Sequence, residues 1–205
     1  MIRLKAMPVQ EKFQHAFEMV RLYQKHVLPF VESHLGYGEM HNLRSVWRAG
    51  IIPIHEKDSV EDKYTQAYSN WLWMARCSHD ALADQLSNGE VLEYKRLLLS
   101  MYEQRLNNPD LAVLRLLRAH RRLAKAYFYE MQWQTPLELT SYSKTGVTCL
   151  VRECKIRQIP GTERVCRVDC QHVGAAYARK VYHLKRVTTQ FDHGCEISLT
   201  PWKAS

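Results

Sequence analysis

The chain has 205 residues, 46% of them hydrophobic, which is typical of one globular domain or of a helical half and a mixed half that share a core. Its apolar runs are only a few residues long, which excludes a transmembrane helix, and its basic N-terminus lacks the apolar segment of a signal peptide. We therefore expect a cytoplasmic protein without a membrane partner. The formal net charge of +8 favours anionic partners.

The first two thirds of the sequence predict helices. A first helix follows Pro8, because apolar residues recur there at near-helical spacing until Pro29 interrupts them late. The stretch from Leu35 to Lys57 is rich in Gly, His and Pro and predicts a long connection. Ser59, with an Asp three residues later, resembles a capping box for a second helix, which Ser87-Asn88-Gly89 ends.

A third helix is predicted from about residue 90 to 106, with a break at 107–110 and a fourth helix from 111 to about 132. The fourth helix is amphipathic, and around it lies the densest cluster of positive charge: Arg115, Arg118, Arg121, Arg122 and Lys125. Such a face binds phosphates in some proteins, but charged helix faces are usually only solvated. Because no nucleic-acid-binding motif accompanies it, we do not expect a nucleic acid partner.

The periodicity changes after Pro136. Two alternating segments, 137–142 and 147–152, flank a turn and predict a β-hairpin. A helix is expected from Cys166 to about Lys180, followed by strands at 183–190 and 195–199. The sequence thus predicts an α+β fold, in which a helical part (1–134) packs on a small antiparallel sheet with one or two helices, the Cys-rich part (135–205).

The cysteines are the most informative residue type, because five of the six lie in the last quarter of the chain. These five are Cys149, Cys154, Cys166, Cys170 and Cys195. A reducing cytosol disfavours a disulfide framework and leaves thiol chemistry, metal ligation or plain burial. A single buried cysteine usually packs as a small hydrophobic residue, and five in one segment weaken that interpretation without removing it.

Four features of this segment follow one another in a recognisable order. Cys154 lies near the end of a strand, and Cys166 and Asp169 form a Cys-x-x-Asp that opens a helix. A strand with Arg186, Thr188 and Thr189 follows, and Cys195 lies in the closing strand. In this order they resemble the L-2-amino-thiazoline-4-carboxylic acid hydrolase-like family, which is similar to the 4-vinyl reductase type of ligand-binding domain. The resemblance covers roughly 137–199, about a third of the chain. It implies hydrolysis of a cyclic amidine or 2-aminothiazoline-like C–N bond, in which water adds to the ring and opens it.

Such a reaction needs a nucleophile or an activated water, and an acid for the departing group. Cys166 is the candidate nucleophile, because a helix N-terminus favours a thiolate. Asp169 is a candidate to hold the substrate amidinium or to act as a base, and His193 is a candidate to shuttle a proton. Arg186 and Cys195 are candidates for substrate binding. The competing interpretation is that Cys166 and Cys170 are simply the buried face of the helix and that Asp169 stabilises its first turn.

Two alternatives remain open at this point. Cys154, Cys166, Cys195 and His193 are the candidate ligands of a zinc ion, and the resemblance itself implies zinc in some 4-vinyl reductase-type domains. The leading hypothesis requires no cofactor. The other alternative is a non-catalytic small-molecule or metal-binding module that acts as a sensor or as the partner of another protein. The expected partner is a small-molecule substrate, and whether the chain forms a homo-oligomer is left open.

Overall fold

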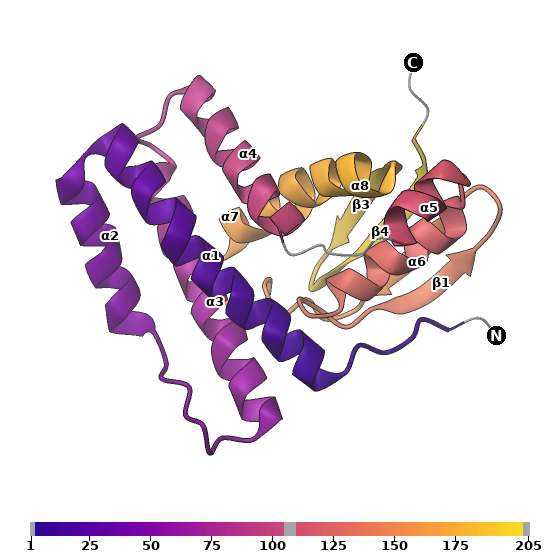
Figure 1. Cartoon of the computed structure of the whole chain (residues 1–205), viewed down its shortest axis with the longest axis horizontal. Coiled ribbons are helices and arrows are strands. Elements are labelled where there is room, and N and C mark those ends of the chain that lie inside the picture. Colours follow the sequence, from indigo (N-terminus) through magenta and orange to yellow (C-terminus); the bar gives the residue numbers. More distant parts are fainter. Residues whose placement is uncertain (1–2, 105–109, 203–205) are drawn as a thin grey trace.

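The computed structural model describes residues 3–104 and 110–202 and has an α+β fold (Figure 1). The N-terminal helices are α1 (Val9–Leu35), α2 (Tyr37–Gly50), α3 (Val60–Leu82), α4 (Asn88–Gln104), α5 (Asp110–Leu116) and α6 (His120–Met131). The C-terminal elements are β1 (Glu138–Tyr142), β2 (Val147–Val151), α7 (Glu163–Val165), the π-helix η1 (Cys166–Val173), α8 (Gly174–Tyr182), β3 (Leu184–Phe191) and β4 (Gly194–Pro201). In the described ranges, no helix is long and apolar enough to cross a membrane.

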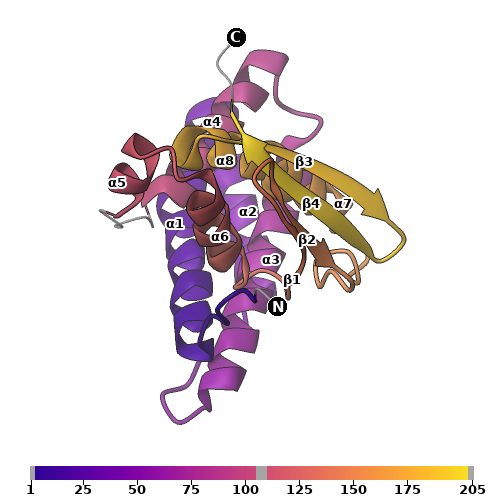
Figure 2. The same ribbon diagram turned by 90° about the vertical axis from the view of Figure 1, so that its right-hand side faces the viewer.

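The strands form one antiparallel sheet in the order β1-β2-β4-β3. Side chains alternate between its faces, and one face is buried under α6 and α8 (Figure 2). On β3 the residues at 186, 188 and 190 share this buried face, and the register sets Gln190 opposite Cys195 and Thr188 opposite Ile197. The sheet therefore presents a row of polar side chains and thiols toward the helices.

The π-helix η1 lies between this sheet and the N-terminal helices. It continues from α7 and into α8, so one helical segment runs from 163 to 182. The helix α4 packs against η1 and α8, while α1 packs against α2, α3 and α4. The core that joins these layers includes the fully buried indoles of Trp47, Trp71 and Trp133.

Two helical predictions are confirmed. Ser59 caps α3, because its Oγ accepts a hydrogen bond from the backbone N–H of Asp62 at 3.1 Å and donates to the Asp62 carboxylate at 2.7 Å. The helix expected from Cys166 to about Lys180 is also present, but it begins earlier and contains the π-helical segment. Of the break expected at 107–110, positions 107–109 lie outside the described residues, and α5 begins at Asp110.

The long connection expected between Leu35 and Lys57 is wrong, because most of it is the helix α2. Gly36, with φ of +89°, ends α1 and lets the chain turn directly into α2. Met40, Leu43 and Trp47 then supply a buried stripe at helical spacing. Glycines at positions 36, 38 and 50 flank this stripe, which made the segment resemble a connection in the sequence.

Two further boundaries differ from the prediction. The helix α1 continues through Pro29 to Leu35 instead of stopping there. The predicted fourth helix is two helices, because Arg118 adopts a left-handed conformation with φ of +50° and separates α5 from α6.

Candidate functional site

The candidate site lies where the buried face of the sheet meets η1 and the turn that follows α6. The sheet contributes Arg186, Thr188 and Gln190 from β3, at alternating positions that face the helices. The turn after α6 contributes Gln134 and Thr135, which are both buried. The π-helix η1, the strand β3 and the turn after α6 are far apart in the chain and thus line one region.

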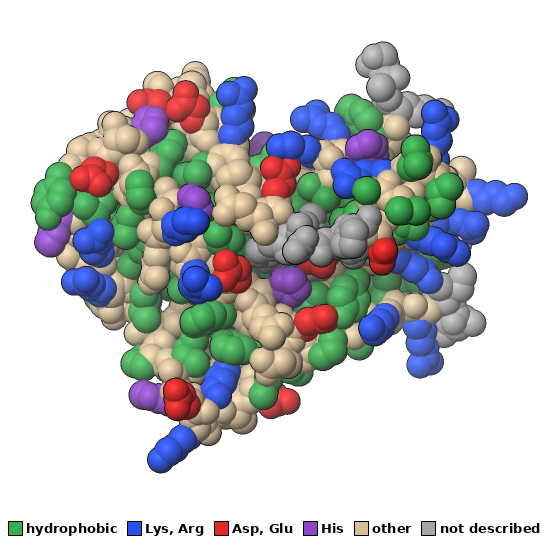
Figure 3. All heavy atoms as spheres, in the orientation of Figure 1, with side chains coloured by type: hydrophobic (Ala, Val, Ile, Leu, Met, Phe, Trp, Pro, Cys, Tyr) green, Lys and Arg blue, Asp and Glu red, His purple; other side chains and the backbone are tan. Residues whose placement is uncertain are grey.

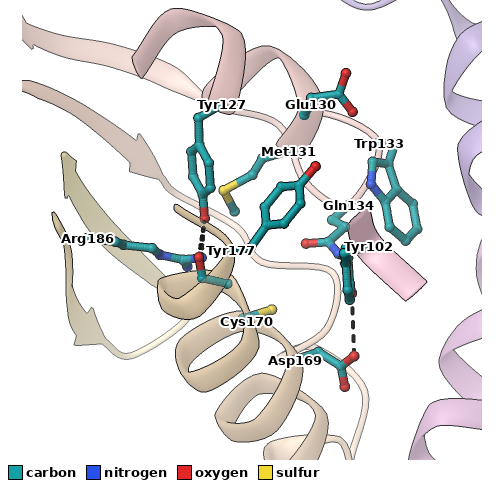
Figure 4. A pocket seen from close by; sticks show the side chains of 11 residues that line it. Tyr102, Tyr127, Glu130, Met131, Trp133, Gln134, Asp169, Cys170, Tyr177 and Arg186 are labelled. Atoms are coloured by element: carbon teal, nitrogen blue, oxygen red, sulfur yellow. Dashed lines mark hydrogen bonds between the residues drawn. The ribbon is translucent and has the colours of Figure 1, made fainter. Parts of the chain in front are cut away.

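Two small cavities occupy this region. The first, which we call the cysteine cavity, has a volume of about 20 Å³ and is lined by residues that include Cys154, Cys166, Cys170, Cys195, Thr135, Arg186 and Gln190. The second, the tyrosine cavity, has a volume of about 30 Å³ and is lined by residues that include Tyr102, Tyr127, Tyr177, Trp133 and Asp169 (Figure 4). Each has room for about one or two water molecules.

The two cavities are neighbours that share a wall. Met131, Gln134, Cys170 and Arg186 line both of them. A ligand larger than water therefore needs the side chains of this wall to move, and such a movement would join the two spaces. We treat the cavities as two halves of one candidate site.

Cys166 is the best-placed nucleophile in the cysteine cavity. Its side chain accepts hydrogen bonds from two carboxamides, that of Gln190 at 3.2 Å and that of Gln171 at 3.8 Å. N–H donors stabilise a negatively charged sulfur more than a neutral one. The residue is 8% exposed and lies in the first turn of the helical segment 163–182. The helix dipole at that end also favours negative charge.

The thiols of Cys154, Cys170 and Cys195 stay protonated at neutral pH. Burial raises the pKa of Cys195 to about 11. Burial also raises the pKa of Cys154, and it raises that of Cys170 well above the usual range. The cavity therefore holds neutral S–H groups around Cys166, and these are weak hydrogen-bond donors.

Arg186 is the buried cation of the site. Its guanidinium donates to the hydroxyl of Tyr127 at 2.6 Å and to that of Thr188 at 3.1 Å, and it lies over the Tyr127 ring (Figure 4). Within the described residues, no carboxylate forms an ion pair with it. A buried charge without a counter-ion is costly, and an anionic ligand group between the two cavities would offset that cost.

One neutral polar group of the cysteine cavity lacks a hydrogen-bond partner among the described residues. The hydroxyl of Thr135 is buried and has no hydrogen-bond partner in the described part of the chain. A buried unsatisfied hydroxyl in a functional protein calls for an explanation, such as a water or a ligand. Together, Arg186 and Thr135 give the cavity one cationic and one neutral group for a polar ligand.

Asp169 is the centre of a separate buried network that ties η1 to the N-terminal helices. Its carboxylate is within 2.5 Å of Nε2 of His79 and accepts hydrogen bonds from the hydroxyls of Tyr23 and Tyr102 at 3.2 and 3.4 Å. The other ring nitrogen of His79 lies 3.3 Å from the hydroxyl of Tyr94. Burial and the charge of Asp169 raise the pKa of Tyr23 and Tyr94 well above the usual range.

The structure brings together four of the predicted site residues, namely Cys154, Cys166, Cys195 and Arg186, all of which line the cysteine cavity. Asp169 lines the neighbouring tyrosine cavity instead, and its oxygens are already bonded to protein groups. His193 is not brought in, because its side chain is exposed in the β3–β4 turn. Only its backbone carbonyl reaches the cluster, by accepting from the backbone N–H of Cys154.

The alternative zinc site is not assembled by this arrangement. In the described ranges, no group of three or more His, Cys, Asp or Glu side chains is placed to hold a metal ion. The separation of His193 from the thiols is one reason.

Sequence reasoning missed several residues of the site. Gln190 was detectable, because it follows Arg186 and Thr188 at alternating positions of one strand. His79 lies at helical spacing from Ala75 and Leu82 on the buried face of α3, and a histidine on an apolar face is a signal of a buried partner. Thr135 gave no signal, because its burial depends on the turn after α6.

No protein-family model, curated protein or solved structure matches this chain. The resemblance of the C-terminal segment to the thiazoline hydrolase-like family thus remains an interpretation of its residues.

Proposed function

We propose that the chain is a small-molecule hydrolase that opens a cyclic amidine or 2-aminothiazoline-like ring at a C–N bond, with Cys166 as the nucleophile. The observation that carries this proposal is the placement of Cys166, whose Sγ lines a cavity together with Arg186 while accepting hydrogen bonds from two carboxamides. A thiolate needs such donors, and an anionic substrate needs such a cation.

The reaction would proceed in two steps that together consume one water. The Cys166 sulfur bonds to the amidine carbon, the ring C–N bond breaks, and the departing nitrogen takes up the thiol proton. Water then adds to the same carbon, the bond to Cys166 breaks, and a proton from that water returns to the sulfur. The neutral thiols of Cys154 and Cys195 would donate weak hydrogen bonds to the sulfur as it leaves the carbon in the second step.

Arg186 would orient the substrate in this scheme by pairing with its anionic group. The guanidinium is itself held by Tyr127 and Thr188, so its position is set before a ligand binds. Asp169 would act at a distance, because its bonds to His79 and Tyr23 fix η1 and hence Cys166. We assign it a positioning role and not contact with the amidine.

A direct test uses 2-amino-thiazoline-4-carboxylic acid and mass spectrometry of the product. The expected result is a product heavier by one water, formed by the natural chain and by Cys77→Ala but not by Cys166→Ala. Cys77 is the matched control, because it is a cysteine of α3 outside both cavities. Turnover that survives in Cys166→Ala would refute the nucleophile.

Iodoacetamide supplies an independent test that needs no substrate turnover. Cys166 is expected to alkylate faster than a free cysteine near neutral pH, and Cys195 and Cys154 much more slowly, since burial raises their pKa. The ring compound should protect Cys166. Uniformly slow labelling of all three thiols would contradict the enzymatic proposal.

The small size of the cavities favours a second candidate, a non-catalytic module that binds a small molecule. Cavities of 20 and 30 Å³ hold water but not a ring compound without rearrangement. A sensor would use that rearrangement as its signal. Tight binding of the ring compound without a new product would support this candidate over the hydrolase.

A further inference from the structure

The surface formed by α5 and the start of α6 has an unusual combination of exposed aliphatic and basic side chains. Val113, Leu116 and Leu117 are 55%, 84% and 68% exposed, although they are neighbours on or just after one short helix. Single exposed aliphatic side chains are common, but a group of them on one projection marks an interaction site. Figure 3 shows hydrophobic side chains over α5 with Lys and Arg side chains gathered beside them.

The basic side chains surround a hollow next to these aliphatic residues. The hollow has a volume of about 370 Å³ and is lined by Arg118, Arg121, Arg122 and Lys144, together with Ala119, His120 and Tyr142. Among the described residues, no Asp or Glu side chain lines this hollow. Arg121 and Lys125 both lie over the ring of Tyr142, at 5.5 and 4.8 Å from its centre, which holds their charges on this face.

The break in the predicted fourth helix creates this surface. A continuous helix would have laid its aliphatic side chains along one stripe, against the sheet. The left-handed residue Arg118 instead ends α5, and the backbone N–H of Ala119 bonds back to the carbonyl of Leu114. As a result Leu116 and Leu117 project from the molecule beside the hollow.

We propose that this face docks on an anionic lipid surface, with the aliphatic side chains of α5 in the interfacial region and the basic hollow on the lipid headgroups. Peripheral proteins bind such surfaces by combining buried apolar area with attraction between basic side chains and acidic lipids. No spanning helix is needed. The expectation of no membrane partner was based on the lack of long apolar runs, which bears on spanning and not on surface contact.

Other occupants fit the face less well. A second copy of the chain would bring two sets of basic side chains together, and like charges repel across an interface. A nucleic acid would satisfy the basic hollow through its phosphates but would leave Leu116 and Leu117 without a role. Only a surface that is acidic at its boundary and apolar beneath it uses both features.

The experiment is sedimentation of the full chain with phosphatidylcholine vesicles, with and without an equal part of phosphatidylserine. We expect binding to the acidic vesicles only, and we expect it to weaken as salt is added. The double variant Leu116→Ser/Leu117→Ser should bind about tenfold or more weakly. Arg121→Ser/Arg122→Ser should also lose about tenfold, because each basic residue near the surface contributes.

Matched controls separate this face from the rest of the surface. Leu92→Ser removes a side chain of α4 that is 50% exposed, and Arg48→Ser removes an exposed charge of α2, so neither should change binding. Circular dichroism of each variant shows whether it is folded. Failure of the folded natural chain to sediment with acidic vesicles would overturn the proposal, and so would equal binding to both vesicle types.

Two further outcomes would point to the rival occupants and would also overturn it. One is retention of an oligonucleotide with no vesicle binding, unaffected by the leucine variant. The other is a concentration-dependent dimer in light scattering that the leucine variant dissociates, again with no vesicle binding. Ring-opening activity plays no part in any of these results, so the proposal stands or falls independently of the hydrolase.

Discussion

The reactivity of Cys166 depends on single hydrogen-bond donors, chiefly the carboxamide of Gln190. Its Nε2 lies 3.2 Å from the sulfur, and Gln190→Leu removes the donor while nearly keeping the volume. A hydrogen bond to a charged group contributes about 1.5 kcal/mol or more, so we expect Cys166 to alkylate about tenfold more slowly at neutral pH in this variant. Mass spectrometry after a short exposure to iodoacetamide gives the rate.

Gln24→Leu is the control for this experiment, because Gln24 is an exposed residue of α1. Cys166 should alkylate at the same rate in Gln24→Leu as in the natural chain. An unchanged Cys166 rate in Gln190→Leu would mean that the sulfur is not activated by this donor.

A second prediction for a single residue concerns the buried carboxylate of Asp169. The change Asp169→Asn keeps the shape but removes the charge that faces His79 and the hydroxyl of Tyr23. Breaking a buried pair costs about 3–5 kcal/mol, so we expect the free energy of unfolding in urea to fall by about that amount. The neighbouring change Asp80→Asn, in an exposed residue that pairs with Arg164, should cost less than about 0.5 kcal/mol. Equal effects of the two variants would contradict a structural role for the buried pair.

Among the elements, the π-helix and α8 determine how closely the helix approaches β3. A Cβ at Gly174 would collide with the guanidinium of Arg186, which Tyr127 and Thr188 hold in place. We expect Gly174→Ala to lower the free energy of unfolding by about 1–3 kcal/mol, measured in urea. The same change at Gly38, in α2, meets no atom within 4 Å and should be neutral or stabilising.

A double-mutant cycle identifies the cause of this loss. If the collision with Arg186 is responsible, Gly174→Ala should cost clearly less in an Arg186→Met background. An equal cost in both backgrounds would place the effect in the helix backbone.

Local signals made some elements predictable. The strands were found because polar and apolar residues alternate around recognisable turns, and the cap of α3 was found because Ser59 and Asp62 have the spacing of a capping box. The helix α2 was missed because its buried stripe is short and is flanked by glycines at positions 36, 38 and 50. The break at Arg118 was not predictable, since no Gly or Pro marks it.

The residues of the site also divide into those that local sequence signals mark and those that only tertiary packing brings in. Cys154, Cys166, Cys195 and Arg186 were identified from the sequence and do line one cavity. Strand alternation carries Cys195 and Arg186 inward and the helix face carries Cys166, whereas Cys154 lies in the loop after β2. His193 was placed by its nearness to Cys195 in the chain, which a tight β3–β4 turn does not preserve in space. The partners of Asp169 come from α1, α3 and α4, and only tertiary packing brings those helices to it.

For the whole molecule, the buried thiols predict lower stability at alkaline pH. Burial raises the pKa of Cys149 to about 12, whereas a cysteine of the unfolded chain has a pKa of about 8.5. The raised value means that the thiol's contribution is complete below about pH 8.5 and is lost as the pH rises toward 12. Over that range the unfolded chain releases a proton that the folded chain retains, which lowers the free energy of unfolding by about 1.4 kcal/mol per pH unit.

The variant Cys149→Ala isolates this contribution from the other groups that titrate at high pH. Urea unfolding between about pH 8.5 and 10.5, under reducing conditions, should show a decline that is shallower than in the natural chain by about 1.4 kcal/mol per pH unit. Val147→Ala shortens another buried side chain on the same face of β2 without removing a titratable group. It should lower stability at every pH and leave the slope unchanged, because a cavity costs the same whatever the proton concentration. If the curves of Cys149→Ala and the natural chain run parallel, the thiol of Cys149 ionises as readily in the folded chain as in the unfolded one, and its burial does not couple stability to pH.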